Sequence, residues 1–171
     1  MNHDVTSSED AIPEASETKA KRASGFQPSL KGRALRLLSL REHSRQELER
    51  KLKPFEETPG ELAEALDFLQ AKDFINEQRV VESVVNSRSR KLGASRVRQE
   101  LQAKGLPAEA IAEAVQAMRS TELERAREVW RKKFGEAPQD AAARAKQIRF
   151  LVSRGFAPEV VRRVVAGADD L

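Results

Sequence analysis

The residues of this 171-residue chain that could do chemistry are basic and lie close together in the sequence. Between positions 79 and 104 there are seven basic side chains and only two acidic ones, Glu82 and Glu100. The basic residues are Arg79, Arg88, Arg90, Lys91, Arg96, Arg98 and Lys104. Guanidinium and ammonium groups at this density attract phosphates and carboxylates, so they predict a polyanionic or acidic partner.

A helix expected over residues 77–92 divides its side chains between two faces. Its apolar stripe consists of Val81, Val84, Val85 and Leu92. Arg79 and Arg90 lie on the opposite, polar and free stripe, and Arg96 points outward from the next helix, because helix neighbours recur every three or four residues. These three residues are the leading candidates for partner binding, followed by the remaining candidates Lys91, Arg98 and Lys104. The alternative interpretation for any one of them is an ordinary solvated helix face.

No set of residues has the spacing of a catalytic site or a metal site. The chain has no cysteine and two histidines, which removes thiolate nucleophiles and the usual zinc ligand sets. His43 precedes Ser44, but Ser44 is better explained as a helix cap, and nothing supplies a positioned third partner. Neighbouring carboxylates, as at Glu56–Glu57, point apart on a helix. We therefore predict no catalytic residue, no metal, no cofactor and no enzymatic activity.

Two further sets of side chains are assigned to packing. Trp130 shares a helical stripe with Leu123, Ala126 and Phe134, which is typical of a core position. Most of the seven phenylalanines are also expected to face the core, so an aromatic platform for single-stranded nucleic acid is not predicted. Arg88 is expected to bury its stem and reach water or a carboxylate with its charge.

A short phrase recurs along the chain and defines its organisation. Residues 101–106 (Leu-Gln-Ala-Lys-Gly-Leu) return 50 residues later as 151–156 (Leu-Val-Ser-Arg-Gly-Phe), and residues 48–52 are a weaker third copy. Such a period indicates a supersecondary unit stacked on copies of itself, an architecture that mostly binds other macromolecules. Gly105 and Gly155 are expected to end the repeated helix in the left-handed conformation.

The apolar periodicity predicts an all-α protein made of three tandem three-helix repeats in an elongated, curved array. Repeat 1 is assigned to residues 29–75, the basic repeat 2 to 76–119 and repeat 3 to 120–171. Ser44 with Glu47, and Thr58 with Glu61, have the spacing of capping boxes. Residues 1–28 are polar and without apolar periodicity, so we expect a disordered tail.

The distribution of apolar residues indicates where in the cell the protein is expected to work. No apolar run approaches the roughly 18 residues of a membrane helix, and the N-terminus has no apolar signal region. We therefore expect a cytoplasmic protein without membrane contact. Separately, we expect the protein to be a monomer.

These residues resemble the RecX family of bacterial regulatory proteins, over about residues 34–165. In repeat 1 the matching residues are Arg41, Ser44, Glu47, Leu48, Lys51 and Leu52. In repeat 2 they are Arg88, Lys91, Gly93, Arg96, Val97, Glu100, Leu101, Lys104 and Gly105. In repeat 3 they are Lys146, Phe150, Leu151, Arg154, Gly155 and Phe156. The chain departs from the family at Asn76 and Glu77, where two aspartates usually precede an aromatic residue and alanine.

The resemblance implies a modulator of the RecA recombinase with a role in recombination, DNA repair and the SOS response. Such a protein binds in the groove of the RecA filament on single-stranded DNA and suppresses ATP hydrolysis, strand exchange and co-protease activity. Two other interpretations stay open from the residues themselves. One is a helical-repeat protein that binds nucleic acid directly through phosphate contacts, and the other is an interaction scaffold for a different partner.

Overall fold

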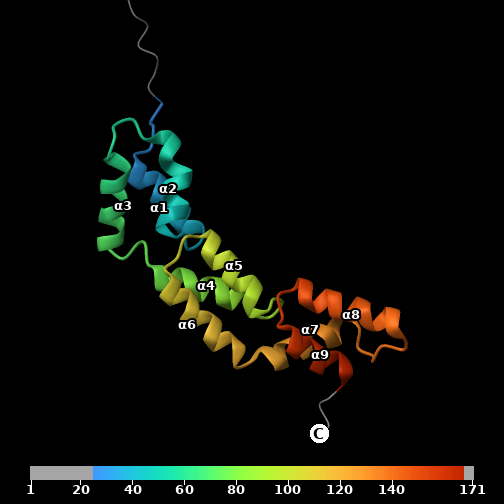
Figure 1. The fold of residues 1–171 in the computed structure, drawn as a ribbon. Coiled ribbons are helices and arrows are strands. Elements are labelled where there is room, and N and C mark those ends of the chain that lie inside the picture. Colours follow the sequence, from blue (N-terminus) through green and yellow to red (C-terminus); the bar gives the residue numbers. More distant parts are fainter. Residues whose placement is uncertain (1–24, 168–171) are drawn as a thin grey trace, which may run out of the picture.

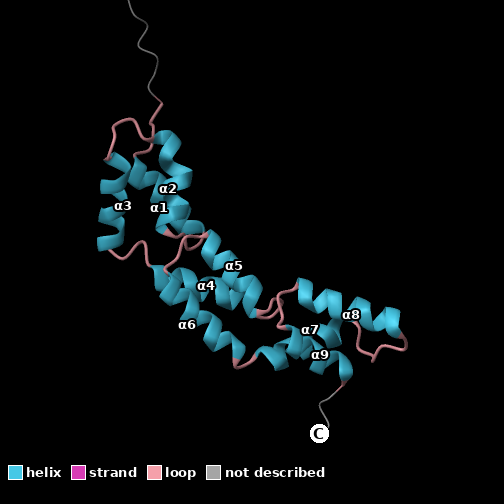
Figure 2. Cartoon of the chain, in the orientation of Figure 1, coloured by secondary structure: helices cyan, strands magenta, loops and turns pink. Residues whose placement is uncertain are grey.

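The computed structural model describes residues 25–167, a stretch built from helices and turns in which no strand occurs. The helices form three successive three-helix repeats along an elongated, bent path (Figure 1). Only short loops join the helices (Figure 2). The predicted all-α array of three repeats is therefore confirmed. Most of the tail that was predicted to be disordered, residues 1–24, lies outside the described residues.

Each repeat buries its own apolar core. Repeat 1 contains α1 (Leu30–Leu40), α2 (Arg45–Leu52), the short 3₁₀ helix η1 (Lys53–Phe55) and α3 (Glu61–Ala71). Repeat 2 contains α4 (Glu77–Arg88), α5 (Ala94–Ala103) and α6 (Ala108–Arg119), and repeat 3 contains α7 (Glu122–Lys133), α8 (Ala141–Ser153) and α9 (Pro158–Ala166). Leu48, Leu101 and Leu151, the leucines of the repeated phrase, are fully buried in three separate clusters. The phrase therefore marks the same core position in every repeat.

The helix ends follow from local chemistry in most places. The Ser44 hydroxyl accepts from the Glu47 N–H, and the Glu47 carboxylate accepts from the Ser44 N–H, which is the predicted capping box. Gly105 and Gly155 have φ of 71° and 87°, as predicted for left-handed caps. The Leu106 and Phe156 N–H groups then reach back to the carbonyls of Leu101 and Leu151.

Two predicted helix boundaries are wrong. Helix α4 ends at Arg88 and not at residue 92, because the following turn leads into a tertiary contact in which the Gly93 N–H donates to the Arg154 carbonyl. Thr58 forms no capping box. The N-cap of α3 is Gly60 at φ 90°, and the Leu62 N–H donates to the Glu56 carboxylate at 2.9 Å.

The glycine turns of the repeated phrase lie at the joints between repeats. At the first joint the Lys104 carbonyl accepts from the Ser44 hydroxyl at 2.5 Å, at the start of α2. At the second joint the carbonyls of Arg154 and Gly155 accept from the N–H groups of Gly93 and Ser95, at 2.8 and 3.3 Å. The C-terminal end of each repeated helix thus meets the N-terminal end of its counterpart in the preceding repeat. Opposite ends of the helix dipoles face each other there.

The aromatic side chains divide between core and surface. Trp130 packs against the core of repeat 3 and donates to Gln147 at 2.8 Å, which confirms its packing role. The expectation that most phenylalanines face the core is wrong, because four of the seven are exposed. These are Phe26, Phe55, Phe68 and Phe74. Lys31 lies over the Phe68 ring at 4.0 Å and Arg33 over the Phe55 ring at 3.9 Å, so cations cover part of this apolar surface.

Candidate functional site

Arg79 does not lie on a free basic stripe, and that expectation is wrong. Its guanidinium forms ion pairs with the carboxylates of Glu42, at 3.0 Å, and Asp73, at 2.9 Å. Glu42 belongs to the loop between α1 and α2, so the contact joins repeats 1 and 2. The hydrogen bond to Glu42 raises the pKa of Arg79 above its ordinary value. A helical wheel could not show this partner, because it comes from the preceding repeat.

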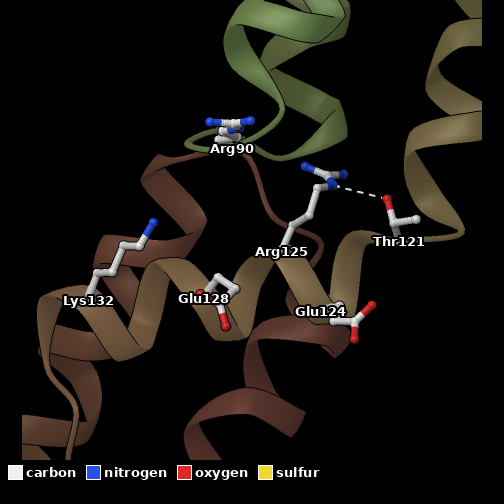
Figure 3. A pocket seen from close by; sticks show the side chains of 6 residues that line it. All are labelled: Arg90, Thr121, Glu124, Arg125, Glu128 and Lys132. Atoms are coloured by element: carbon white, nitrogen blue, oxygen red, sulfur yellow. Dashed lines mark hydrogen bonds between the residues drawn. The ribbon is translucent and has the colours of Figure 1, made fainter.

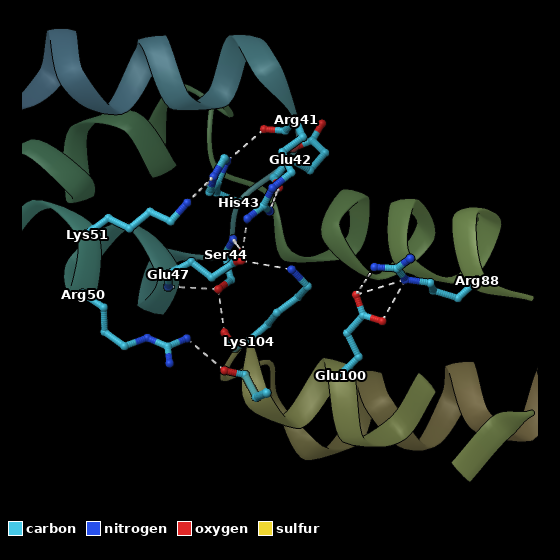
Figure 4. Close-up of polar contacts among 11 residues, drawn as sticks. Arg41, Glu42, His43, Ser44, Glu47, Arg50, Lys51, Arg88, Glu100 and Lys104 are labelled. Atoms are coloured by element: carbon cyan, nitrogen blue, oxygen red, sulfur yellow. Dashed lines mark hydrogen bonds and ion pairs between the residues drawn. The ribbon is translucent and has the colours of Figure 1, made fainter. Parts of the chain in front are cut away.

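Lys104 also belongs to the first joint (Figure 4). Its side chain is 16% exposed, and its ammonium lies 3.0 Å from the Glu47 carboxylate. Arg41 donates to the same carboxylate at 3.0 Å. Burial alone would raise the pKa of Glu47, but the hydrogen bonds from Arg41, Lys104 and the Ser44 N–H outweigh it and lower the pKa to about 2. Lys104 therefore stabilises the contact between repeats 1 and 2 through its ion pair with Glu47.

Arg88 behaves as predicted for a residue at the edge of the apolar stripe. Its guanidinium contacts both oxygens of the Glu100 carboxylate on α5, at 3.0 to 3.3 Å (Figure 4). Three of the seven basic residues between positions 79 and 104 are thus neutralised by carboxylates. These are Arg79, Arg88 and Lys104.

The other four basic residues of this stretch are exposed, and none pairs with a carboxylate of the described chain. They are Arg90, Lys91, Arg96 and Arg98. The structure places them apart. Arg90 lies in the turn after α4 and faces α7, whereas Arg96 lies beside the Gly155 turn of repeat 3. Arg98 lies at a groove between α5 and α6, so these cations cover several sides of repeat 2 instead of one stripe.

A hollow of about 210 Å³ lies where repeat 2 meets α7 (Figure 3). Arg90 and Lys132 flank it, together with Glu124 and Glu128. Arg125 also lines the hollow, and it donates to the carbonyls of Ser89, Leu92 and Met118 at 2.8 to 2.9 Å. Sequence reasoning missed Arg125, because a residue that binds backbone carbonyls leaves no charge pattern.

Repeat 3 adds a second group of exposed cations that sequence reasoning did not select. Its members Lys132, Arg144, Lys146 and Arg149 are exposed and pair with no described carboxylate. Lys146 and Arg149 lie on the outer face of α8, away from buried Gln147 and Leu151. The neighbouring residues Ala142 and Ala145 are small, so a polyanion could approach this helix closely. Repeat 2 is therefore not the only basic part of the array.

The described residues provide no metal site, and His43 and Ser44 are engaged in structural contacts. The described part of the chain contains no cluster of three or more His, Cys, Asp or Glu residues that could hold a metal ion. His43 is buried, and its ring contacts the Arg41 carbonyl and the Lys51 ammonium. Its neighbour Ser44 uses its hydroxyl in the first joint. Over residues 25–167 no helix is both long enough and apolar enough to span a membrane.

Comparison with known proteins gives consistent matches along the three repeats. Family models described as the first, second and third three-helix domains of RecX match residues 31–69, 76–115 and 120–165. Regulatory protein RecX of Leptothrix cholodnii is 54% identical over 143 residues, covering 84% of this chain and 91% of its own. Its counterpart in Ralstonia pickettii is 46% identical over 143 residues, covering 84% and 90%.

A solved structure shows the same fold. The crystal structure of RecX from Lactobacillus salivarius superposes with a TM-score of 0.70 and covers 83% of this chain and 96% of that chain. The two sequences are 20% identical, so this likeness concerns the fold alone.

Proposed function

Since the chain belongs to the RecX family of regulatory proteins, we propose that it binds the RecA filament on single-stranded DNA and inhibits RecA. The inhibited activities are ATP hydrolysis, strand exchange and co-protease function. The observation that supports this proposal most directly is the series of exposed cations without carboxylate partners along repeats 2 and 3. Such a series complements an acidic protein surface or DNA phosphate.

The shape of the array supports contact with a filament. The repeats follow one another along a bent path, so basic residues of repeats 2 and 3 can contact neighbouring protomers at the same time (Figure 1). Linked contacts raise the apparent affinity by about 10² to 10⁴ without any strong individual site. We assign the partner contacts to Arg90, Lys91, Arg96 and Arg98. Arg79 and Lys104 are left out of this set, because they form ion pairs at the first joint.

The test measures RecA ATPase activity on single-stranded DNA while the protein is titrated. Arg90→Glu combined with Arg96→Glu should weaken inhibition about tenfold or more, because repulsion replaces attraction at two linked contacts. The matched control reverses two exposed cations of repeat 1, Lys31 and Lys72, and should inhibit like the parent. Circular dichroism must show unchanged helix content. Equal inhibition by both double variants would refute the assigned site.

Direct binding to nucleic acid is the second candidate, favoured by Lys146 and Arg149 on the outer face of α8. It requires binding to bare single-stranded DNA without RecA, with an affinity that falls as salt rises. Each phosphate contact should contribute about −0.7 to the slope of log K against log salt. Lys146→Glu with Arg149→Glu should then reduce the slope magnitude by about 1.4. Tight binding to bare DNA at physiological salt would favour this candidate over the filament inhibitor.

We also propose that the protein is a non-catalytic monomer that works in the cytoplasm without a cofactor. The buried, already bonded imidazole of His43 supports the non-catalytic role. The monomer is tested by light scattering during gel filtration, which should give the chain mass of 19.1 kDa. A mass twice as large would contradict it.

A further inference from the structure

A hollow of about 240 Å³ opens on repeat 1, between α1 and the end of α2. Its wall includes the apolar side chains of Pro28, Leu52 and Phe55. Its basic residues are Arg33, Arg36 and Lys51, and no carboxylate lines it. This combination suits an apolar side chain flanked by carboxylates.

Two of the basic residues at this hollow, Arg36 and Lys51, are available to a ligand. No ion pair joins Arg36 to another described residue, and the Lys51 ammonium contacts only the His43 ring nitrogen, at 3.4 Å. Arg33 stacks on Phe55 and donates to Gln27 at 3.1 Å. Phe55 itself is 47% exposed, so the apolar wall is open to solvent. An acidic segment would therefore gain charge pairing and apolar contact at one place.

The complementary segment is part of the same chain. Residues 1–18 contain five carboxylates and no lysine or arginine. Within them Ile12 stands between Asp10 and Glu14, an apolar side chain flanked by two carboxylates. Pro28 lies on the wall of the hollow, and the 16 residues from Ile12 to Pro28 can span up to about 50 Å. The segment is thus tethered at the hollow and long enough to enter it.

We propose that this hollow is a docking site for the acidic N-terminal segment of the same chain. Ile12 enters against Phe55 and Leu52, while Asp10 and Glu14 face Arg36 and Lys51. A short tether gives an effective concentration in the millimolar range, so a contact with a Kd of about 1 mM would be formed about half of the time. The docked segment would shield Arg36 and Lys51 of repeat 1, leaving the cations of repeats 2 and 3 exposed. This proposal does not depend on the proposed function.

The absence of cysteine from the parent sequence allows a clean test on the full chain. Ser16→Cys carries a nitroxide spin label, and the amide signals of the ¹⁵N-labelled protein are compared before and after reduction of the label. Docking predicts strong broadening at Gly32, Arg36 and Leu52. Broadening should shrink at about 0.5 M NaCl, where the Debye length is about 4 Å. It should also shrink in Arg36→Glu, in Asp10→Asn with Glu14→Gln, and in Ile12→Ser.

Lys72→Glu is the matched control, because Lys72 is an exposed cation of the same repeat that does not line the hollow. It should leave the broadening unchanged. Broadening that only declines with distance from residue 25, and that ignores Arg36→Glu, would overturn the proposal. A mixture of ¹⁵N-labelled chain without nitroxide and unlabelled chain with nitroxide should show no broadening at the hollow. Broadening in the mixture would assign the hollow to the segment of a second copy and overturn the intramolecular site.

Discussion

Gly93 and Gly155 meet backbone to backbone at the joint between repeats 2 and 3. A Cβ atom on Gly93 would lie 2.2 Å from the Gly155 carbonyl oxygen, and one on Gly155 would lie 2.5 Å from the Cβ of Arg96. Because the obstructing atoms belong to backbone or lie next to it, they cannot move aside cheaply. The joint therefore requires glycine at both positions.

Gly155→Ala should lower the free energy of unfolding by about 2 kcal/mol or more, through a left-handed φ and a collision at the joint. Gly135→Ala is the control, since Gly135 has a similar φ of 71° but its nearest obstructing atom is 3.4 Å away. Gly135→Ala should lower the free energy of unfolding by only about 1 kcal/mol, because alanine is strained at a left-handed φ but meets no atom closer than 3.4 Å. Urea unfolding followed by circular dichroism measures both. Equal losses would show that the joint tolerates a side chain.

The glycines illustrate how far the sequence could predict the fold. The helices follow from local signals. Apolar spacing is present in every repeat, the capping serines Ser29 and Ser44 belong to repeat 1, and Gly105 and Gly155 precede an apolar residue in repeats 2 and 3. The joints do not follow from local signals, because Gly93 and Gly155 lie far apart in the sequence and only the folded chain brings them together. The same reason explains the helix that ends at Arg88, earlier than its apolar pattern predicts.

Glu47 should make the first joint sensitive to acid. Its pKa of about 2 lies below the ordinary value of 4.5, so the folded state favours the carboxylate. This contribution to stability is complete above about pH 4.5 and is lost as the pH falls from 4.5 towards 2. Glu47→Gln should lower the free energy of unfolding by about 2 kcal/mol at neutral pH, because it leaves the largely buried Lys104 and the more exposed Arg41 without their carboxylate. Urea unfolding at several pH values measures the difference.

The exposed Glu49 provides a control for that experiment, as it pairs with Arg45 on the same helix. Glu49→Gln should lower the free energy of unfolding by at most about 0.5 kcal/mol. The stability difference between Glu47→Gln and the parent should shrink as the pH falls from 4.5. A difference that is undiminished at pH 2.5 would mean that the carboxylate charge does not stabilise the joint.

His43 should add a second pH dependence at higher pH. Burial, together with the charges of Arg41 and Lys51, lowers its pKa below 6.5, so the folded state favours the neutral ring. Below pH 6.5 the imidazole is protonated in the unfolded chain but stays neutral in the folded chain. The free energy of unfolding therefore decreases as the pH is lowered below 6.5. The imidazole proton shifts in an NMR titration should give a pKa under 6.5. A value at or above 6.5 would contradict the buried neutral ring.

The candidate site could be predicted from the sequence only in part. The sequence predicts partner binding by a basic stretch, but it could not distinguish Arg79 and Lys104, which pair across the first joint, from Arg90 and Arg96, which do not. Pairing depends on carboxylates from another repeat, and no periodicity within one helix reports them. Lys146 and Arg149 could have been found from the sequence, since both fall on the outer face of a predicted helix.

Arg125 should hold repeats 2 and 3 at a fixed angle without supporting either core. Its guanidinium donates to carbonyls at the ends of α4 and α6. Arg125→Met leaves these acceptors without their donor, so it should lower the free energy of unfolding by about 2 kcal/mol. Arg131→Met, at an exposed position of the same helix, should change stability by no more than about 0.5 kcal/mol. Helix content should stay constant in both, because each repeat has its own core. Hydrogen exchange should accelerate in Arg125→Met at the amides of Gly93 and Ser95, which bond across the joint. If these amides exchange at the parent rate, the backbone contacts of Gly93 and Gly155 hold the joint without the arginine.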